Sequence, residues 1–115
     1  MLRKITIVLL VCCTLLSFAQ NKEKVWIFFN DKNNTSFNPY EYFDAKAIER
    51  RIKHGISLYD SSDFPVNEMY VQQITELGFE EKVISRWFNA IIGFADISSI
   101  EKIKQLPFVK EIIIY

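Results

Sequence analysis

The fold is decided by the stretch Val83-Ile84-Ser85-Arg86-Trp87-Phe88-Asn89-Ala90-Ile91-Ile92-Gly93-Phe94-Ala95. It contains two runs that are rich in aliphatic and aromatic residues, 83–87 and 90–95, and they are separated near Phe88-Asn89. Such runs are typical of β-strands, and an asparagine between them favours a turn. The stretch therefore predicts a β-hairpin or a bulged ribbon.

Two further strands are expected on either side of this hairpin. Residues 25–29 are apolar and end at the turn-prone run 30–34, as expected of a buried strand. Residues 109–115 include three consecutive isoleucines and form the last expected strand. The hydrophobic runs thus predict four strands.

Helical patterns separate these strands. Residues 44–54 predict a helix that Asp44 caps at its N-terminus, and residues 67–78 predict a second helix. Ser98 and Glu101 have the spacing of a capping box, which predicts the start of a third helix that ends before Pro107. The first two helices lie between the same pair of strands, so we interpret them as two pieces of one helical layer.

The expected order is strand, helix in two pieces, strand, strand, helix, strand. This order predicts an α+β fold of the ferredoxin-like βαββαβ class, in which a four-stranded antiparallel sheet carries its helices on one face. We expect residues 20–115 to form this single domain. The fold hosts many functions and does not identify one.

Residues 1–19 have the features of a signal peptide. A short positive segment, 1–4, precedes an apolar run at 5–18, and small residues lie at the positions that a signal peptidase requires. We expect cleavage between Ala19 and Gln20, and hence export to the cell envelope or beyond. The apolar run is too short to span a bilayer comfortably.

Both cysteines, Cys12 and Cys13, lie in this leader. A lipid anchor on one of them is the alternative to simple cleavage, but Val11 and Cys12 are not the small residues that lipidation needs before the modified cysteine. Once the leader is removed, the chain has no cysteine, so its fold cannot depend on disulfides or on cysteine-bound zinc.

Composition predicts neither catalysis nor a cofactor. The chain has 14 basic and 14 acidic side chains, and removing Arg3 and Lys4 leaves 12 basic ones, which does not suggest a nucleic acid or an anionic membrane as partner. The single histidine, His54, is expected near a helix C-terminus, where the helix dipole favours it. We expect no catalytic residue, no metal ligand and no phosphate-binding loop.

Two segments are more particular than the rest. Ala47-Ile48-Glu49-Arg50-Arg51 would ordinarily be a solvated helix face, and Ser85-Arg86-Trp87-Phe88-Asn89-Ala90 would ordinarily be core aromatics beside a turn. Residue chemistry alone favours these ordinary interpretations.

Several motifs taken together resemble one family. They are Trp26-Ile27-Phe28-Phe29 with Asp31-Lys32, Ala47-Ile48-Glu49-Arg50-Arg51, Asp63-Phe64-Pro65-Val66-Asn67, Ser85-Arg86-Trp87-Phe88-Asn89-Ala90 and Leu106-Pro107-Phe108-Val109. In this order they resemble the N-terminal pro-domain of secreted subtilisin-family serine peptidases of the Bacteroidetes type. The resemblance covers nearly all of the chain after the leader.

The resemblance implies a function. Such a pro-domain is a monomeric ferredoxin-like unit that assists the folding of its catalytic domain in cis and inhibits it. Its sheet packs on two surface helices of that domain, and the peptide after the last strand lies in the substrate cleft. The residues then expected at the interface are Arg86, Trp87, Phe88 and Asn89. Many subtilisin pro-domains have aspartate where this chain has Asn89, and asparagine can also cap a partner's helix.

The sequence stops at Tyr115, so the family's processing tail and catalytic residues are not expected in it. Two other classes of function stay open. One is a stand-alone secreted protease inhibitor or binding module with this fold, and the other is a ferredoxin-like domain that binds a small molecule at a strand–helix loop.

Overall fold

The computed structural model describes residues 21–115. The predicted leader, with its cleavage site between Ala19 and Gln20, lies outside the described residues. Along the described chain the elements are β1 (Glu23–Phe29), α2 (Pro39–Tyr42), α3 (Ala45–Lys53), the 3-10 turn η1 (Ser61–Asp63), α4 (Glu68–Glu76), β2 (Glu80–Ser85), β3 (Ala90–Ala95), α5 (Ile97–Lys104) and β4 (Val109–Ile114). None of the helices in residues 21–115 is long and apolar enough to cross a membrane.

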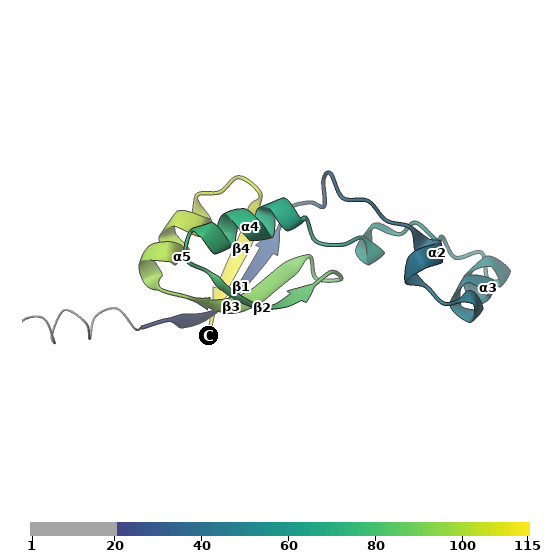
Figure 1. Ribbon diagram of the computed structural model, residues 1–115, viewed down its shortest axis with the longest axis horizontal. Coiled ribbons are helices and arrows are strands. Elements are labelled where there is room, and N and C mark those ends of the chain that lie inside the picture. The colour runs from purple at the N-terminus through teal and green to yellow at the C-terminus, as the bar shows by residue number, and fades with distance from the viewer. Residues whose placement is uncertain (1–20) are drawn as a thin grey trace, which may run out of the picture.

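The four strands form one sheet in the order β2-β3-β1-β4, and every neighbouring pair is antiparallel. Ile27 at the centre of β1 lies opposite Ile91 of β3 on one side and Ile112 of β4 on the other. Helices α4 and α5 lie over the same face of the sheet (Figure 1). This arrangement confirms the predicted ferredoxin-like α+β fold.

The core lies between this face and the two helices. Alternate residues of β1 (Val25, Ile27 and Phe29) are buried there, as the two-residue period of a strand requires. Ile74 of α4 and Ile103 of α5 cover them and are fully buried. Each such side chain stabilises the fold by about 1.5–3 kcal/mol through the removal of apolar surface from water. The core therefore holds the domain together without cysteines.

The start of α5 differs from the prediction. The helix is capped by Asp96, whose Oδ1 accepts a hydrogen bond from the Ser99 backbone N–H at 2.7 Å. The predicted cap, Ser98, lies inside the first turn and is exposed. Aspartate is as good an N-cap as serine, and the cap at position 96 begins the helix two residues earlier. The predicted capping box of Ser98 and Glu101 was therefore wrong.

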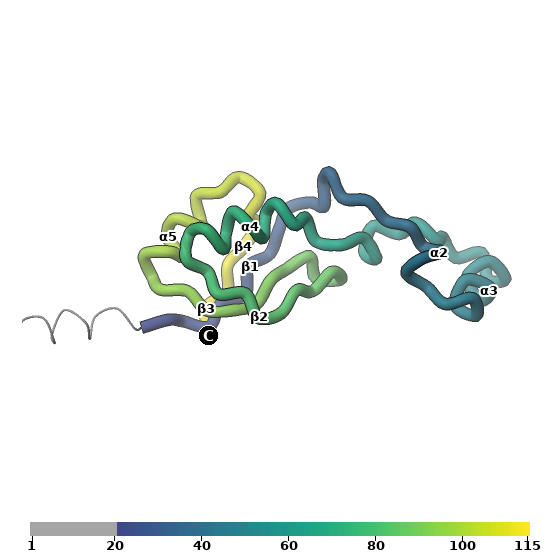
Figure 2. The backbone as a smooth tube through the Cα atoms, in the orientation of Figure 1, coloured from purple at the N-terminus to yellow at the C-terminus, as the bar shows by residue number. Residues whose placement is uncertain are grey.

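The predicted two-piece helical layer is also corrected. Only α4 packs on the sheet beside α5, whereas α2 and α3 lie in an extension that leaves the end of β1 and returns to the start of α4 (Figures 1 and 2). We call this extension, residues 31–66, the arm. No residue of α3 is buried, and its apolar Ile52 is 63% exposed, so this helix does not cover the sheet.

Strand β2 begins at Glu80 and ends at Ser85, whereas the sequence pattern predicted residues 83–87. Its pairing with β3 shifts register between Glu81 and Val83, which marks a β-bulge. Opposite the bulge lies Gly93, and a Cβ placed there would overlap the backbone carbonyl of Glu80. The glycine lets the two backbones approach closely, as glycines inside strands often do.

Candidate functional site: an open sheet face and a hairpin loop

The sheet face opposite α4 and α5 carries a row of apolar side chains. Trp26 of β1 lies opposite Ile92 of β3 and Ile113 of β4, and residues directly opposite in antiparallel strands share a face. Val83 of β2 extends the row, because it lies opposite Ile92. We call this surface the open face; its members are Trp26, Phe28, Val83, Ile92, Phe94 and Ile113.

Aromatic rings lie on the open face and along its border. The ring of Trp26 stacks on that of Phe28 with centroids 5.9 Å apart. Phe88 meets Trp26 edge-on at 6.3 Å, and Tyr115 meets it at 6.4 Å. Trp26 and Phe28 are half-buried, whereas Phe88 is 66% exposed and Tyr115 is 71% exposed. Apolar surface of this kind, rimmed by polar groups, is typical of protein-binding sites.

The loop that joins β2 to β3 borders the open face. It consists of Arg86, Trp87, Phe88 and Asn89, the four residues that the family resemblance leads us to expect at an interface. Trp87 at its tip is 73% exposed. Asn89 has a φ of 51°, in the left-handed region that asparagine tolerates, and this conformation turns the chain into β3.

The four loop residues do not share one environment. The side-chain amide of Asn89 donates to the backbone carbonyls of Phe29 at 3.2 Å and Asp31 at 2.9 Å. Its Oδ1 is buried and has no hydrogen-bond partner within the part of the chain that the structure describes. The Asn89 side chain is thus bound to its own domain, and in this structure it does not project towards a partner.

Arg86 likewise faces the protein. Its Nη1 donates to the Asp63 backbone carbonyl at 3.0 Å, and its guanidinium lies 4.2 Å from the centre of the Tyr42 ring. Both contacts are with the arm. Of the predicted interface residues, Trp87 and Phe88 are therefore exposed, while Arg86 and Asn89 are bonded to the rest of the domain.

A family model, the Peptidase S8 propeptide domain of Bacteroidota, matches residues 24–115. The chain belongs to this propeptide family. No curated protein and no solved structure matches it. The propeptide is a non-catalytic part of S8 peptidases, and membership implies association with an S8 catalytic domain in cis and export with the precursor.

Sequence reasoning assigned no role to Lys32 of this propeptide. Its ammonium group donates to four backbone carbonyls, those of Ser61 at 2.9 Å, Ser62 at 3.1 Å, Phe64 at 2.7 Å and Arg86 at 2.6 Å. Burial, and then the nearby charge of Arg86, lower the pKa of Lys32 below its usual value. The only signal in the sequence was the Asp31-Lys32 pair among the motifs of the resemblance.

The propeptide's arm has a small aromatic core of its own. The ring of Phe37 lies 5.2 Å from that of Phe64 and 6.0 Å from that of Phe43. Arg51 covers this core with its guanidinium 4.1 Å from the Phe43 ring centre, and it pairs with the buried Asp63 at 3.4 Å. The motif at residues 47–51 thus contributes one structural cation and is not merely a solvated face.

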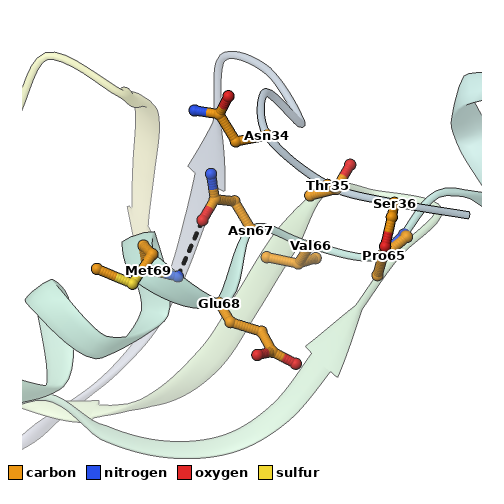
Figure 3. Close-up of a pocket in the computed structure, with 8 residues that line it drawn as sticks. All are labelled: Asn34, Thr35, Ser36, Pro65, Val66, Asn67, Glu68 and Met69. Atoms are coloured by element: carbon orange, nitrogen blue, oxygen red, sulfur yellow. Dashed lines mark hydrogen bonds between the residues drawn. The ribbon is translucent and has the colours of Figure 1, made fainter.

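A hollow of about 360 Å³ lies at the N-terminus of α4 (Figure 3). Asn67 already caps this helix by accepting from the Met69 backbone N–H at 2.9 Å, and the acidic Glu68 lines the same hollow. These groups disfavour an anion there. Within residues 21–115 no group of histidine, cysteine and carboxylate side chains is arranged to hold a metal ion. His54 is exposed at the C-cap of α3, in the arm.

Proposed function

We propose that this propeptide is the folding assistant and inhibitor of the subtilisin-like catalytic domain in its own precursor. It binds that domain in cis, as a monomer, through the open face. The observation that carries the proposal is the row of apolar side chains on the open face, which neither α4 nor α5 covers.

The open face suits a partner that is largely apolar and rigid. Trp26, Phe28 and Phe88 present adjoining rings, and aromatic side chains supply much contact area for little loss of conformational freedom. Two packed helices on the surface of a catalytic domain would match a flat sheet face of this kind. Docking would then stabilise both partners, since a ligand that binds only the folded state shifts the folding equilibrium.

Inhibition follows from the position of β4. This strand lies at one edge of the sheet, so a segment that continues from it can extend into a substrate cleft as an added strand. The open face would hold the propeptide in place while that segment blocks the cleft. The sheet would thus set the direction in which the segment after β4 leaves the domain.

A binding titration tests the interface. The propeptide is titrated against the S8 catalytic domain of the same precursor, with the nucleophilic serine replaced by alanine. We expect Phe88→Ala to weaken binding at least about tenfold, as for a central aromatic contact. The matched control is Ile97→Ala, because Ile97 is a similarly exposed apolar residue, at 54%, on the helical side of the domain.

Each other outcome has a definite meaning. Equal losses in Phe88→Ala and Ile97→Ala would place the interface elsewhere. Absence of binding by any form would favour a stand-alone binding module and remove the proposal. A refolding assay of the denatured catalytic domain, with and without the propeptide, tests folding assistance separately from binding.

The leader belongs to the same proposal. Export requires removal of residues 1–19, so the secreted chain should begin at Gln20. The intact mass of protein recovered from the periplasm or the medium checks this. A mass that includes a diacylglyceryl group on Cys12 or Cys13 would instead support the lipid anchor.

A further inference from the structure

The end of β1, the arm and the hairpin loop meet at one junction, and Lys32 lies at its centre. Three of the carbonyls that Lys32 binds belong to the returning segment of the arm, and the fourth is that of Arg86 in the loop. An ammonium group has three N–H donors, so four acceptors leave it none for a partner. Lys32 thus connects the outgoing segment of the arm both to its returning segment and, through the Arg86 carbonyl, to the loop.

Arg86 crosses the same junction in the opposite direction. From the loop, its guanidinium donates to the Asp63 carbonyl and lies over the Tyr42 ring, and both groups belong to the arm. The carboxylate of Asp63 is itself held by Arg51 at 3.4 Å. The loop and the arm are therefore connected by two cations, one from each side.

The other end of the loop is fixed as well. The amide of Asn89 binds the carbonyls of Phe29 and Asp31, next to Lys32 in the chain. Between the loop and the arm remains a hollow of about 360 Å³, with Ser61 and Ser62 on the arm side and Trp87 on the loop side. Only the tip of the loop, Trp87 and Phe88, is left exposed.

We propose that Lys32 and Arg86 are positioning residues that make the arm and the hairpin loop a single rigid unit. They hold Trp87 and Phe88 in one orientation, so that order in the arm and order in the loop are gained and lost together. Preorganised side chains bind with less loss of conformational entropy. The consequence for binding rests on the proposed function, whereas the coupling of arm and loop concerns the free chain.

Backbone order measured by ¹⁵N NMR relaxation on the free chain tests the coupling. In the wild type we expect order parameters of about 0.85 at residues 61–64 and 86–89, the value of rigid backbone. In Lys32→Met, which keeps the length of the side chain and removes its donors, both segments should fall below about 0.6. Residues of β1 and β3 should keep their values, because their core contacts are unchanged.

The matched control is Lys82→Met. Lys82 lies in the strand that leads into the loop, but among residues 21–115 its ion pair is with Glu80, at 2.7 Å, and it is exposed. This variant should leave both segments ordered. Arg86→Met is a second variant that cuts the other connection and keeps the backbone carbonyl for Lys32; it decides the question if Lys32→Met does not fold.

The result that overturns the proposal is loosening of the arm alone or of the loop alone in the variants. The partner titration then checks the consequence. Lys32→Met should bind the serine-substituted catalytic domain about tenfold more weakly, mainly through slower association. If the wild type does not bind, the proposed function fails, while the relaxation data still decide whether arm and loop are coupled.

Discussion

Asp96 shows how one side chain fixes the boundary of an element. Its carboxylate accepts from the Ser99 N–H at 2.7 Å, and this bond satisfies a donor that the first turn of α5 would otherwise leave unpaired. We expect Asp96→Ala to lower the melting temperature measurably. Ser98→Ala, the change at the residue that the sequence pattern favoured as cap, should leave it within error. Thermal unfolding followed by circular dichroism checks the pair, and the reverse ranking would contradict the assignment of the cap.

The same residue predicts a response to acid. Hydrogen bonds from Ser99 hold the pKa of Asp96 below its ordinary value of 3.8. The unfolded chain therefore binds a proton more readily than the folded one, so this contribution to stability is full above pH 3.8 and is lost as the pH falls through the folded pKa. In denaturant titrations from about pH 5 down to about pH 2, the difference in the free energy of unfolding between the wild type and Asp96→Asn should shrink. A difference in the free energy of unfolding that does not change with pH would contradict a contribution from the lowered pKa of Asp96.

Asn89 gives a prediction about charge at the loop. Aspartate has no donor for the carbonyls of Phe29 and Asp31, and its carboxylate would face both oxygens. We expect Asn89→Asp to lower the free energy of unfolding by about 1–3 kcal/mol or more, the usual result of unsatisfied buried groups. Asn89→Gly should lower the free energy of unfolding by less, because glycine adopts the observed φ of 51° without strain. Urea unfolding measures both, and a fully stable Asn89→Asp would show that the side chain is free to serve a partner instead.

At the scale of elements, the close approach of β2 and β3 at Gly93 leads to a prediction. Gly93 lies opposite the bulge of β2, and a methyl group there would meet the Glu80 carbonyl and, at 2.8 Å, the Phe79 ring. We expect Gly93→Ala to destabilise the domain by about 1–3 kcal/mol or more, as overpacking does. Lys82→Ala replaces an exposed side chain at the same bulge, and it should change the free energy of unfolding by no more than about 0.5 kcal/mol. A neutral Gly93→Ala would mean that β2 can move away from β3 easily.

Elements that rest on local pattern were predictable, and those that rest on distant contacts were not. The apolar period of residues 67–78 predicted α4, whose Ile74 is fully buried. Residues 44–54 also predicted a helix, correctly, but nothing in them says whether it covers the sheet. That depends on Arg51 and Asp63, which hold α3 in the arm across 12 residues of chain. Local pattern therefore predicted α3, α4 and α5, missed the short helix α2 (Pro39–Tyr42), and left the placement of α3 open.

The candidate site follows the same division. The predicted fold placed its helices on one face of a four-stranded sheet, and the structure has the other face open. Lys32 escaped prediction because its acceptors are backbone carbonyls 29 to 54 residues away, and carbonyls carry no residue signature. The loop 86–89 was identified from its motif, but the three-dimensional structure was needed to distinguish its exposed aromatic residues from Arg86 and Asn89, which bond to the rest of the domain.

At the scale of the whole molecule, the sheet and its two helices enclose one modest core, the arm adds only a small aromatic core, and residues 21–115 contain no cysteine. Domains of this size with a single core are marginally stable, and we expect the isolated chain to unfold well below about 90 °C. Binding of the catalytic domain should raise its melting temperature in a concentration-dependent way. Calorimetry of the free and bound forms tests this, and a hyperstable free chain would contradict it.

The two tryptophans of the chain lie in different surroundings, so their intrinsic fluorescence can report on the state of the molecule. Trp87 is 73% exposed at the loop tip and emits from water, whereas Trp26 is half-buried among rings of the open face. Contact at the loop would move the emission of Trp87 to shorter wavelength, and unfolding would move that of Trp26 to longer wavelength. The direction of the spectral shift alone would thus distinguish capture by a partner from loss of structure, with no label added to the chain.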